Sequence, residues 1–343
     1  MTRAIRIIGS GLAGIHLAWA LHMRGVHFEL IGQDRAYPAW QASAGIINPV
    51  TGKRVVKSWN IDALLPFAQK RYAEVGQKIG VPSHYHNIPL KRFFRPNSDE
   101  IERLNDRLSD PDYTAYLSSK NCDELGFKIN QAAWVDVSTF VEESRAYFLA
   151  KGLFFDDFME YSSIERWQAK SERLAIFCEG AQGTENPWFH WLDYRISRGD
   201  VVDFKTKAKL PSLLINKEKW MLPLGPNVGR MGSTYTWDNL LAPPDSRRPD
   251  ELFQSLNSSI PALNEAEVTT HRVGIRPGTN DSRPYVGEHP RQPGIFILNG
   301  FGSKGASQSP WCAEALVNHM LDWAAIPQDI DVQRRVKFAR GRL

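Results

Sequence analysis

The sequence predicts an α/β protein in which a doubly wound parallel-sheet domain carries an inserted antiparallel-sheet domain of α+β type. Three observations predict this class. Residues 4–8 form a short β-branched segment that runs into a glycine-rich turn and an apolar helix. A second strand, glycine turn and helix follow at residues 295–323. Between them, residues 199–236 contain short alternating runs separated by Pro, Gly and Asn, which is typical of antiparallel sheet.

The length and composition describe an ordinary globular enzyme. The 343 residues exceed the usual size of one hydrophobic core, so we expect two interleaved domains. The net charge of +4 is small, and no basic run alternates with aromatic residues, so we expect no nucleic-acid partner. No apolar run is long enough to span a membrane, and the N-terminus does not resemble a signal peptide. We therefore expect a cytoplasmic protein that does not bind membranes.

Metal and disulfide sites find little support in the sequence. Cys122, Cys178 and Cys312 lie far apart without metal-type spacing, which favours a reducing compartment. His84 and His86 have a spacing that can bind a metal, but no third ligand is apparent and a loop position is favoured. We predict no metal site.

The remaining elements follow from periodicity and from helix-ending residues. The predicted strands of the doubly wound sheet are residues 4–8, 26–31, 174–180 and 295–298. The predicted helices are residues 15–23, 62–79, 135–150 and 309–323. The predicted antiparallel strands are residues 199–204, 213–216, 219–222 and 229–236. Residues 81–128 show no dominant period.

The first glycine turn has the pattern of a dinucleotide-binding motif. Gly9 makes the tight turn, Gly11 lets the backbone approach a pyrophosphate, and Gly14 lets the helix pack close to the strand. Leu12 and Ala13 begin the helix, whose free N–H groups and partial positive charge favour phosphate. A glycine-rich helix start without a ligand is the alternative.

The residue that would hold the adenosine ribose is not where the motif expects it. By register the acidic residue should follow the second strand at position 32, which is Gly32. Asp34 comes two residues later and can reach the ribose from the turn, or Gln33 can hydrogen-bond there instead. Asp34 can equally be an ordinary turn residue.

A second block of small residues follows at residues 42–54. Ala44, Gly45 and Ile46 belong to it and would let the backbone pass beside a flat ring. Lys53 and Arg54 could neutralise a phosphate or a carboxylate, although exposed Lys-Arg pairs are usually only solvated.

A third block makes the resemblance to a family specific. Residues 274–287 read GIRPGTNDSRPYVG, and a glycine-rich turn follows at residues 300–305. Together with GSGLAG at residues 9–14 and EGA at residues 179–181, this pattern resembles the FAD-dependent oxidoreductases of the D-amino acid oxidase and glycine oxidase (DAO) family. The resemblance covers both ends of the chain well and the middle poorly. It implies FAD as cofactor and a Rossmann-like fold of the glutathione-reductase type for the doubly wound domain.

The resemblance also implies roles for individual residues. Arg276 matches the family position that clamps the substrate carboxylate, for which a planar guanidinium is suited; a structural salt bridge is the alternative. Asp281 matches a turn acid that is structural. Lys304 is a catalytic candidate that could assist oxygen activation or bind an acidic group, or could simply be solvated. The residues expected to contact the cofactor in this region are Gly180, Gly300, Gly302, Ser303, Lys304 and Gly305.

The implied domains interleave along the chain. Residues 1–80, 138–185 and 268–343 would form the FAD-binding domain, and residues 81–137 and 186–267 the antiparallel-sheet substrate domain. Trp220, Tyr235 and Trp237 lie in the middle region and could line a pocket or belong to the core.

The implied activity is oxidation of a small amine or amino acid, with hydride transfer from the amine-bearing carbon to the flavin and release of an imine. Molecular oxygen is a possible acceptor. A flavin hydroxylase, an NAD(P)H-dependent reductase and a non-catalytic flavin-binding protein are the alternatives. The sequence leaves the substrate, the electron acceptor and the oligomeric state open.

Overall fold

The computed structural model describes residues 4–32, 34–96, 98–169 and 172–339. Its first sheet has six strands in the order β10-β2-β1-β11-β18-β17. The first five pair in parallel, and β17 closes the edge antiparallel to β18. The strand bounds are β1 Ala4–Ile8, β2 Glu29–Ile31, β10 Phe154–Phe155, β11 Arg173–Phe177, β17 Tyr285–Glu288 and β18 Ile295–Asn299. This is the predicted doubly wound sheet, assembled from both ends and the middle of the chain.

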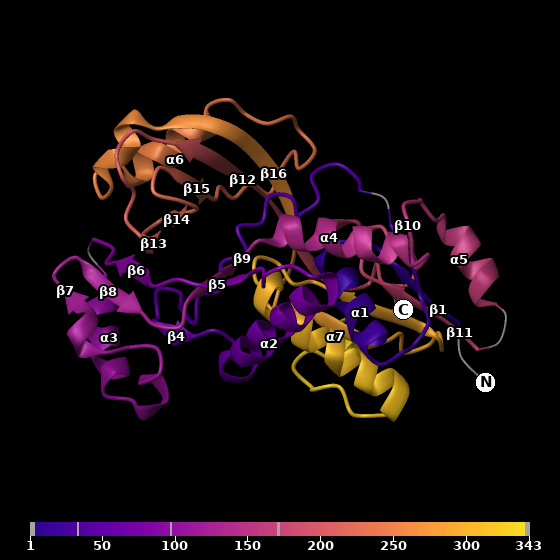
Figure 1. Cartoon of the computed structure of the whole chain (residues 1–343). Helices are drawn as coiled ribbons and strands as arrows, with labels where there is room; N and C mark the ends of the chain where they lie inside the picture. Colours follow the sequence, from indigo (N-terminus) through magenta and orange to yellow (C-terminus); the bar gives the residue numbers. More distant parts are fainter. Residues whose placement is uncertain (1–3, 33, 97, 170–171, 340–343) are drawn as a thin grey trace.

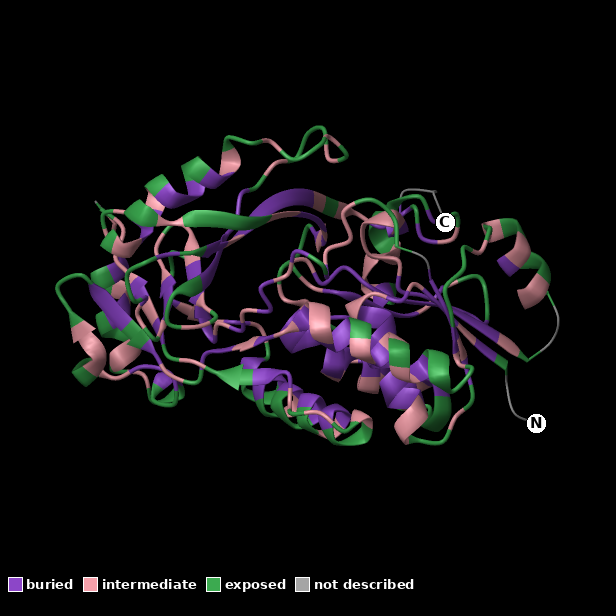
Figure 2. Cartoon of the chain, turned by 45° about the horizontal axis from the view of Figure 1, so that its top comes forward, coloured by how far each residue is buried: buried purple, intermediate pink, exposed green. Residues whose placement is uncertain are grey.

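Helices cover the first sheet and pack on one another (Figure 1). Helix α1, Leu12–Met23, packs against α7, Gly305–Asp322, and against α4, Val137–Ala150; α7 also contacts α2, Ile61–Ile79. The Trp19 side chain is fully buried in α1, and its indole N–H donates to Ser144 of α4 at 2.9 Å. The strands and the inner faces of these helices are buried in Figure 2. Helix α5, Tyr161–Gln168, lies beside β11.

The second sheet has eight strands in the order β16-β12-β15-β14-β13-β6-β8-β7. Its pairs are antiparallel except for β13 and β6, which run parallel. The bounds are β6 Leu90–Phe93, β7 Cys122–Asp123, β8 Gly126–Ile129, β12 Tyr194–Lys205, β13 Leu214–Asn216, β14 Trp220–Pro223, β15 Val228–Gly232 and β16 Glu267–Thr279. Smaller elements complete the chain: β3 Val50–Thr51, β4 Val56–Lys57, β5 Tyr85–Asn87, β9 Ala133–Val135, α3 Glu100–Leu108 and α6 Arg248–Leu256.

The structure differs from the sequence expectations at several places; the strand predicted over residues 229–236, for example, ends at Gly232. Strand β2 begins at Glu29, three residues after the predicted start, and α7 begins at Gly305, directly after the glycine turn. The long strand β16 was not predicted, because Gly274, Pro277 and Gly278 interrupt its pattern. It pairs with β12 along its whole length, so the second sheet extends past residue 268. The division of the chain into two domains stays a prediction.

Close backbone approach explains the glycines of the first turn. A Cβ on Gly9 would lie 2.5 Å from the carbonyl oxygen of Cys178, and one on Gly14 would lie 1.9 Å from the carbonyl oxygen of Gly9. Gly9 also has a φ of 106°, which L side chains rarely adopt. Only glycine therefore lets α1 begin this close to β1 and β11.

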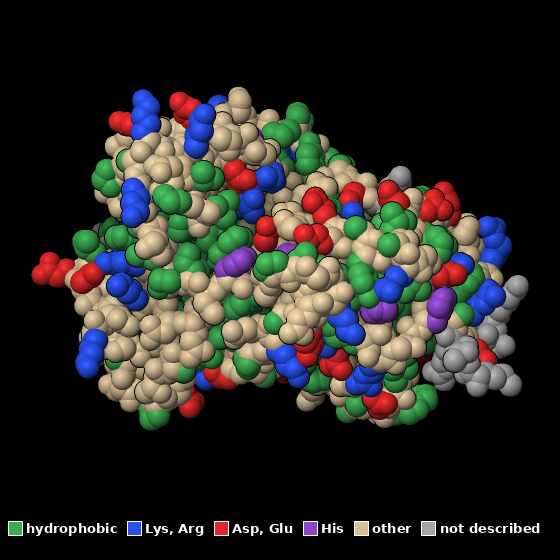
Figure 3. All heavy atoms as spheres, viewed as in Figure 1, with side chains coloured by type: hydrophobic (Ala, Val, Ile, Leu, Met, Phe, Trp, Pro, Cys, Tyr) green, Lys and Arg blue, Asp and Glu red, His purple; other side chains and the backbone are tan. Residues whose placement is uncertain are grey.

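The surface and the helices give two further findings. On the face in Figure 3, basic and acidic side chains are interspersed. No helix within the described ranges is both long and apolar enough to cross a membrane.

Replacing Gly14 with alanine should lower the free energy of unfolding by about 1–3 kcal/mol, because the new methyl group meets backbone that cannot move aside freely. Thermal unfolding measures the effect. Gly225→Ala is the matched control, since nothing lies within 4 Å of a Cβ there. Equal losses in the two variants would contradict the packing argument.

Candidate active site

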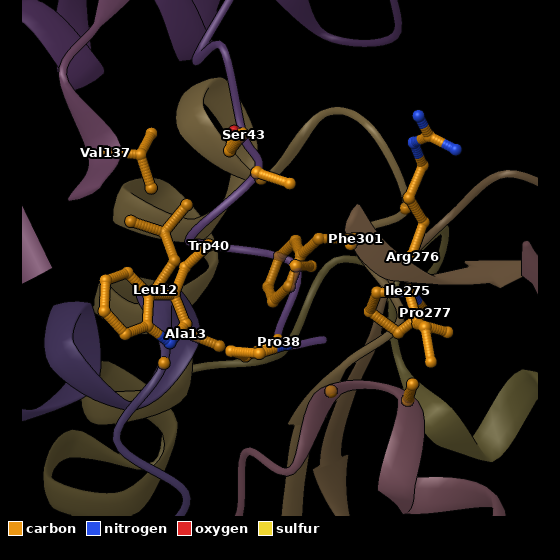
Figure 4. A pocket seen from close by; sticks show the side chains of 18 of the residues that line it. Leu12, Ala13, Pro38, Trp40, Ser43, Val137, Ile275, Arg276, Pro277 and Phe301 are labelled. Carbon is orange, nitrogen blue, oxygen red and sulfur yellow. The ribbon is translucent and has the colours of Figure 1, made fainter. Parts of the chain in front are cut away.

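A cavity of about 530 Å³ opens between the two sheets. Its walls come from the β1–α1 turn, the segment after β2, the end of β11, strand β16 and the turn that starts α7. Figure 4 shows Leu12, Ala13 and Trp40 on one side of the pocket and the Arg276 guanidinium on the other, with Phe301 between them. The third sequence block and the first glycine turn thus face one space.

Most of the predicted site residues line this cavity. They are Gly9, Gly11, Leu12, Ala13, Asp34, Ala44, Gly45, Ile46, Gly180, Arg276, Gly302, Ser303, Lys304 and Gly305. Gly14 does not line it, because it packs against Gly9. Gly300 lines a neighbouring cavity instead. Gln33 lies outside the described residues.

Two helices begin at this cavity. Helix α1 starts at Leu12 and α7 at Gly305, and both residues line the wall. The first N–H groups of a helix have no partner within the helix and carry a partial positive charge, so each start is suited to an anionic or electron-rich group. A Cβ on Gly11 would meet only Trp40, at 3.6 Å, which leaves the turn open for close approach of a ligand. These features fit the pyrophosphate of a dinucleotide.

The absence of an acidic residue at position 32 has a steric cause. A Cβ on Gly32 would lie 2.5 Å from the backbone nitrogen of Ser10. The Ser10 hydroxyl also donates to the Gly32 carbonyl at 3.2 Å. No larger residue fits between the first turn and β2, so any carboxylate for the ribose must come from a neighbouring position.

Asp34 supplies a carboxylate at the cavity wall. Arg145 of α4 donates to both of its oxygens, at 2.6 and 2.8 Å, and also to the carbonyl of Ser10 at 3.0 Å. The Trp40 indole donates to the same carboxylate at 3.1 Å. Burial alone would raise the pKa of Asp34, but hydrogen bonds and charge from Arg145 outweigh it and lower the pKa. Asp34 is therefore ionised and held in one orientation by Arg145 and Trp40. An ordinary turn residue would not need these contacts.

Lys304 stands where the second glycine turn meets α7. Its ammonium donates to the hydroxyl of Ser58 at 2.9 Å, and Ser58 donates in turn to the carbonyl of Asn48 at 2.9 Å. Burial, and then the charge of Arg283, lower the pKa of Lys304. The Lys304 side chain is partly buried, and it has no ion-pair partner among the described residues.

Arg276 projects from β16 toward the same end of the cavity. Its two terminal nitrogens have only long contacts, 3.5 Å each, with the carbonyl of Thr234. The guanidinium carbon lies 4.4 Å from the centre of the Tyr235 ring. Gly199 makes room, since a Cβ there would lie 2.0 Å from an Arg276 nitrogen. Burial lowers the pKa of Arg276, while the charges of Tyr235 and Asp200 act in the opposite direction. No carboxylate in the described ranges forms a salt bridge with Arg276, whose nearest polar partner is the Thr234 carbonyl.

Two of the three aromatic candidates of the middle region are exposed, while Trp220 is partly buried against the core. Tyr235 and Trp237 are 50% and 53% exposed, and their rings stack with centres 6.2 Å apart. Both line a second cavity, while Trp220 and Tyr235 line the first. Tyr235 and Trp237 follow the end of β15 at Gly232, so no alternation pattern could place them, whereas Trp220 begins β14.

Sequence reasoning missed Glu179, which precedes the predicted Gly180 and lines the cavity. Its carboxylate accepts from the Tyr161 hydroxyl and from the Asn186 amide, both at 2.8 Å. Burial raises its pKa to about 7, although both hydrogen bonds act in the opposite direction. The sequence gave no signal for the burial of Glu179, because its two hydrogen-bond partners lie 18 residues before it and 7 residues after it in the chain. Arg145 was missed for the same reason.

Other singled-out residues lie elsewhere. His84 pairs with Glu143 at 2.7 Å, and His86 stacks on Trp134. Within the described ranges no group of His, Cys, Asp and Glu could hold a metal. Asp281 pairs with Arg334 at 3.2 Å. Lys53 and Arg54 are exposed and line neither cavity.

The fold and this cavity define a flavin-dependent oxidoreductase. One glycine turn and helix start is suited to a pyrophosphate, and a second lies beside Arg276 and Lys304. The chain belongs to the family described as FAD dependent oxidoreductase (DAO), whose model matches residues 5–319. Its cofactor is accordingly FAD. The family resemblance and the fold class that the sequence predicted are confirmed.

Individual relatives support the same family. The chain is 21% identical to glycine oxidase of Pseudomonas aeruginosa, over 93% of this chain and 95% of that protein. It is 23% identical to the tRNA 5-methylaminomethyl-2-thiouridine biosynthesis bifunctional protein MnmC of Azoarcus sp., over 98% of this chain but only 60% of that protein. The crystal structure of glycine oxidase from Geobacillus kaustophilus matches with a TM-score of 0.76 at 17% identity, covering 95% of this chain and 97% of that one. Iminodiacetate oxidase from Chelativorans sp. BNC1 matches with a TM-score of 0.73 at 19% identity, covering 95% and 97%.

Replacing Arg145 with methionine should raise the FAD dissociation constant about 10- to 100-fold, because Asp34 loses a charge-assisted partner worth about 1.5–3 kcal/mol. Titration of the FAD-depleted protein with FAD, followed by flavin fluorescence, measures the change. Arg166→Met is the control, since Arg166 is exposed on α5 and lines neither cavity. Unchanged affinity in the Arg145 variant would refute the role of this pair.

Glu179 should make the stability of the FAD-free protein depend on pH. Its pKa is raised in the folded state, so its unfavourable contribution is absent below about pH 4.5 and develops as the pH rises to about 7. Glu179→Gln should therefore be up to about 3 kcal/mol more stable than the wild type at pH 8, and no more stable near pH 4. Urea unfolding at both values measures this. A difference independent of pH would contradict the assignment.

Proposed function

We propose that this protein oxidises an amino acid or amine that carries a carboxylate, using FAD. The observation that carries the proposal is Arg276, a partly buried guanidinium at the cavity wall that forms no salt bridge within the described part of the chain. A buried cation of this kind is costly unless an anion binds beside it. A carboxylate matches the guanidinium in bidentate geometry.

The chain's own residues would hold the two ends of the cofactor. The backbone of residues 9–13 and the start of α1 would bind the pyrophosphate, and Asp34 would accept from the adenosine ribose. Ala44, Gly45 and Ile46 would pass beside the flat ring system, with Gly180 on the wall formed by the end of β11. The start of α7, with Gly302, Ser303 and Gly305, would stabilise negative charge at the flavin.

The reaction requires positioning more than acid–base chemistry. When bound, FAD accepts a hydride from the carbon that bears the amine. The nitrogen loses a proton to solvent, and the resulting imine is hydrolysed by water. Arg276 would fix the carboxylate and so aim the Cα–H bond into the cavity. An amine that binds neutral needs no dedicated general base, so we assign none.

Lys304 would complete the positive end of the site. The Ser58 hydroxyl and the cavity wall hold its ammonium in place. From there it can attract the substrate carboxylate or stabilise negative charge that develops when molecular oxygen reoxidises the cofactor. The glycine oxidase and iminodiacetate oxidase names of the relatives agree with a substrate of this class. A cytoplasmic location remains our expectation.

Anaerobic bleaching of the flavin tests the function. One class among D-amino acids, glycine, sarcosine and other secondary amines should reduce the wild-type flavin. Arg276→Leu should lower kcat/KM about 30- to 5000-fold, since truncating a buried partner of a carboxylate costs about 2–5 kcal/mol. The kcat/KM of Arg276→Lys should lie between those of the wild type and Arg276→Leu, because lysine keeps the charge and loses the planar guanidinium.

Arg272→Leu is the matched control, because Arg272 lies on the same strand and pairs with Asp203 instead of lining the cavity. Rapid bleaching by NAD(P)H with none by amines would replace the proposal by a hydroxylase or reductase. A yellow protein whose flavin is reduced neither by amines nor by NAD(P)H would favour a non-catalytic flavin-binding role.

A further inference from the structure

A second cavity of about 320 Å³ adjoins the first at its positive end. Six residues line both: Tyr235, Arg276, Phe301, Gly302, Ser303 and Lys304. The second cavity then extends past Arg276 to Arg195 and to the exposed ring of Trp237. The proposed substrate position therefore continues outward into a chamber that the oxidation of a molecule as small as glycine does not require.

The strand pairing places the two arginines on one face of the sheet. Ser197 of β12 lies opposite Arg276 of β16, and Arg195 lies opposite Gly278. Residues two apart on a strand share a face, so Arg195 and Arg276 are diagonal neighbours, about 7–8 Å apart on the sheet. The Arg276 guanidinium extends over Gly199, which lies on the other side of Ser197 from Arg195, so the two charged groups are farther apart than the two backbone positions. Gly278, opposite Arg195, has no side chain to fill the space between them.

The chamber is cationic throughout. Arg195, Arg276 and Lys304 line it, and no Asp or Glu is among its described lining residues. The polar contacts of Arg276 and Lys304 are with a carbonyl and a hydroxyl, and the acid whose charge acts on Arg276 is Asp200, which does not line the chamber. The hydroxyls of Ser197, Ser282 and Ser303 also line the wall, and hydroxyls can donate to an anion. Three cations on a wall without an acidic residue among those described favour a ligand with more than one negative charge.

From this arrangement we infer that the substrate is an amine with two anionic groups: a carboxylate bound at Arg276 beside the reacting carbon, and a second carboxylate or phosphonate-like anion bound at Arg195. The inference rests on the proposed function for the position of the first carboxylate. Arg195 is then the residue that selects dianionic substrates, and the stacked Tyr235 and Trp237 rings line the same chamber.

Thioether analogues test binding separately from turnover, because sulfur in place of the amine nitrogen blocks imine formation. Methylthioacetate carries one anion. A series of thioether diacids carries a second carboxylate one to three methylenes from the sulfur, and (phosphonomethylthio)acetate carries a phosphonate. Titration of the oxidised holoenzyme, followed by the visible flavin spectrum, gives each dissociation constant.

The best dianion should bind wild-type holoenzyme at least about tenfold more tightly than methylthioacetate. Arg195→Ala should remove that advantage and leave methylthioacetate binding unchanged, and Arg195→Glu should reverse it. Arg166→Ala is the matched control, as an exposed arginine that lines neither cavity. The advantage should also shrink as salt is added, because Arg195 is exposed. Comparing the dissociation constants of the thioether diacids and of (phosphonomethylthio)acetate shows whether the second anion is a carboxylate or a phosphonate.

The outcomes separate this inference from the proposed function. Dianions that bind no more tightly than methylthioacetate, or an advantage that survives in Arg195→Ala, would overturn the inference even if amines bleach the flavin. Dianions that bind through Arg195 while no amine bleaches the flavin would keep the site and overturn the oxidation. If neither class of analogue changes the flavin spectrum and no amine bleaches it, both are overturned.

Discussion

The close approach of backbone at the first glycine turn is the constraint on which the rest of the structure depends. Gly9, Gly14 and Gly32 each occupy a position where a Cβ would lie within 2.5 Å of a main-chain atom. Their contacts bring β1, β2, β11 and the start of α1 together at one edge of the sheet. The same crowding removes the acidic residue from position 32, so the carboxylate comes from Asp34 and requires Arg145 of α4 to orient it.

The cavity has charges of opposite sign in different places. Asp34 belongs to the cluster of Arg145 and the first glycine turn, and Glu179 is held by Tyr161 and Asn186. Arg276 and Lys304 line another part of the wall without anionic partners among the described residues. A site built this way orients a ligand electrostatically before any chemistry occurs, because the cations gain most when an anion displaces water beside them. Neutral partners, a carbonyl and a hydroxyl, hold these cations in place.

The second sheet fixes the position of Arg276 at the cavity wall. Strand β16 pairs along its full length with β12, and this register decides that Arg276 lies over Gly199 and diagonal to Arg195. Side chains on paired strands have little freedom to shift relative to one another. In the proposed function, this sheet would fix the substrate carboxylate, while turns and helix starts would hold the cofactor. The cavity lies where the two systems meet.

The sequence by itself determined the parallel sheet, its two glycine turns and the helices that follow, because strand and helix periodicity and steric demands on glycine act over a few residues. It also brought Arg276, Asp34 and Lys304 forward as candidates. It did not determine β16, whose Gly and Pro residues break the alternation, nor the contacts of Arg145, Glu179 and Arg195. Those depend on partners distant in the chain, such as Asp34 for Arg145, which is 111 residues away. Only the tertiary structure decided them, because burial and the loss of solvent around a charge are properties of the assembled cavity.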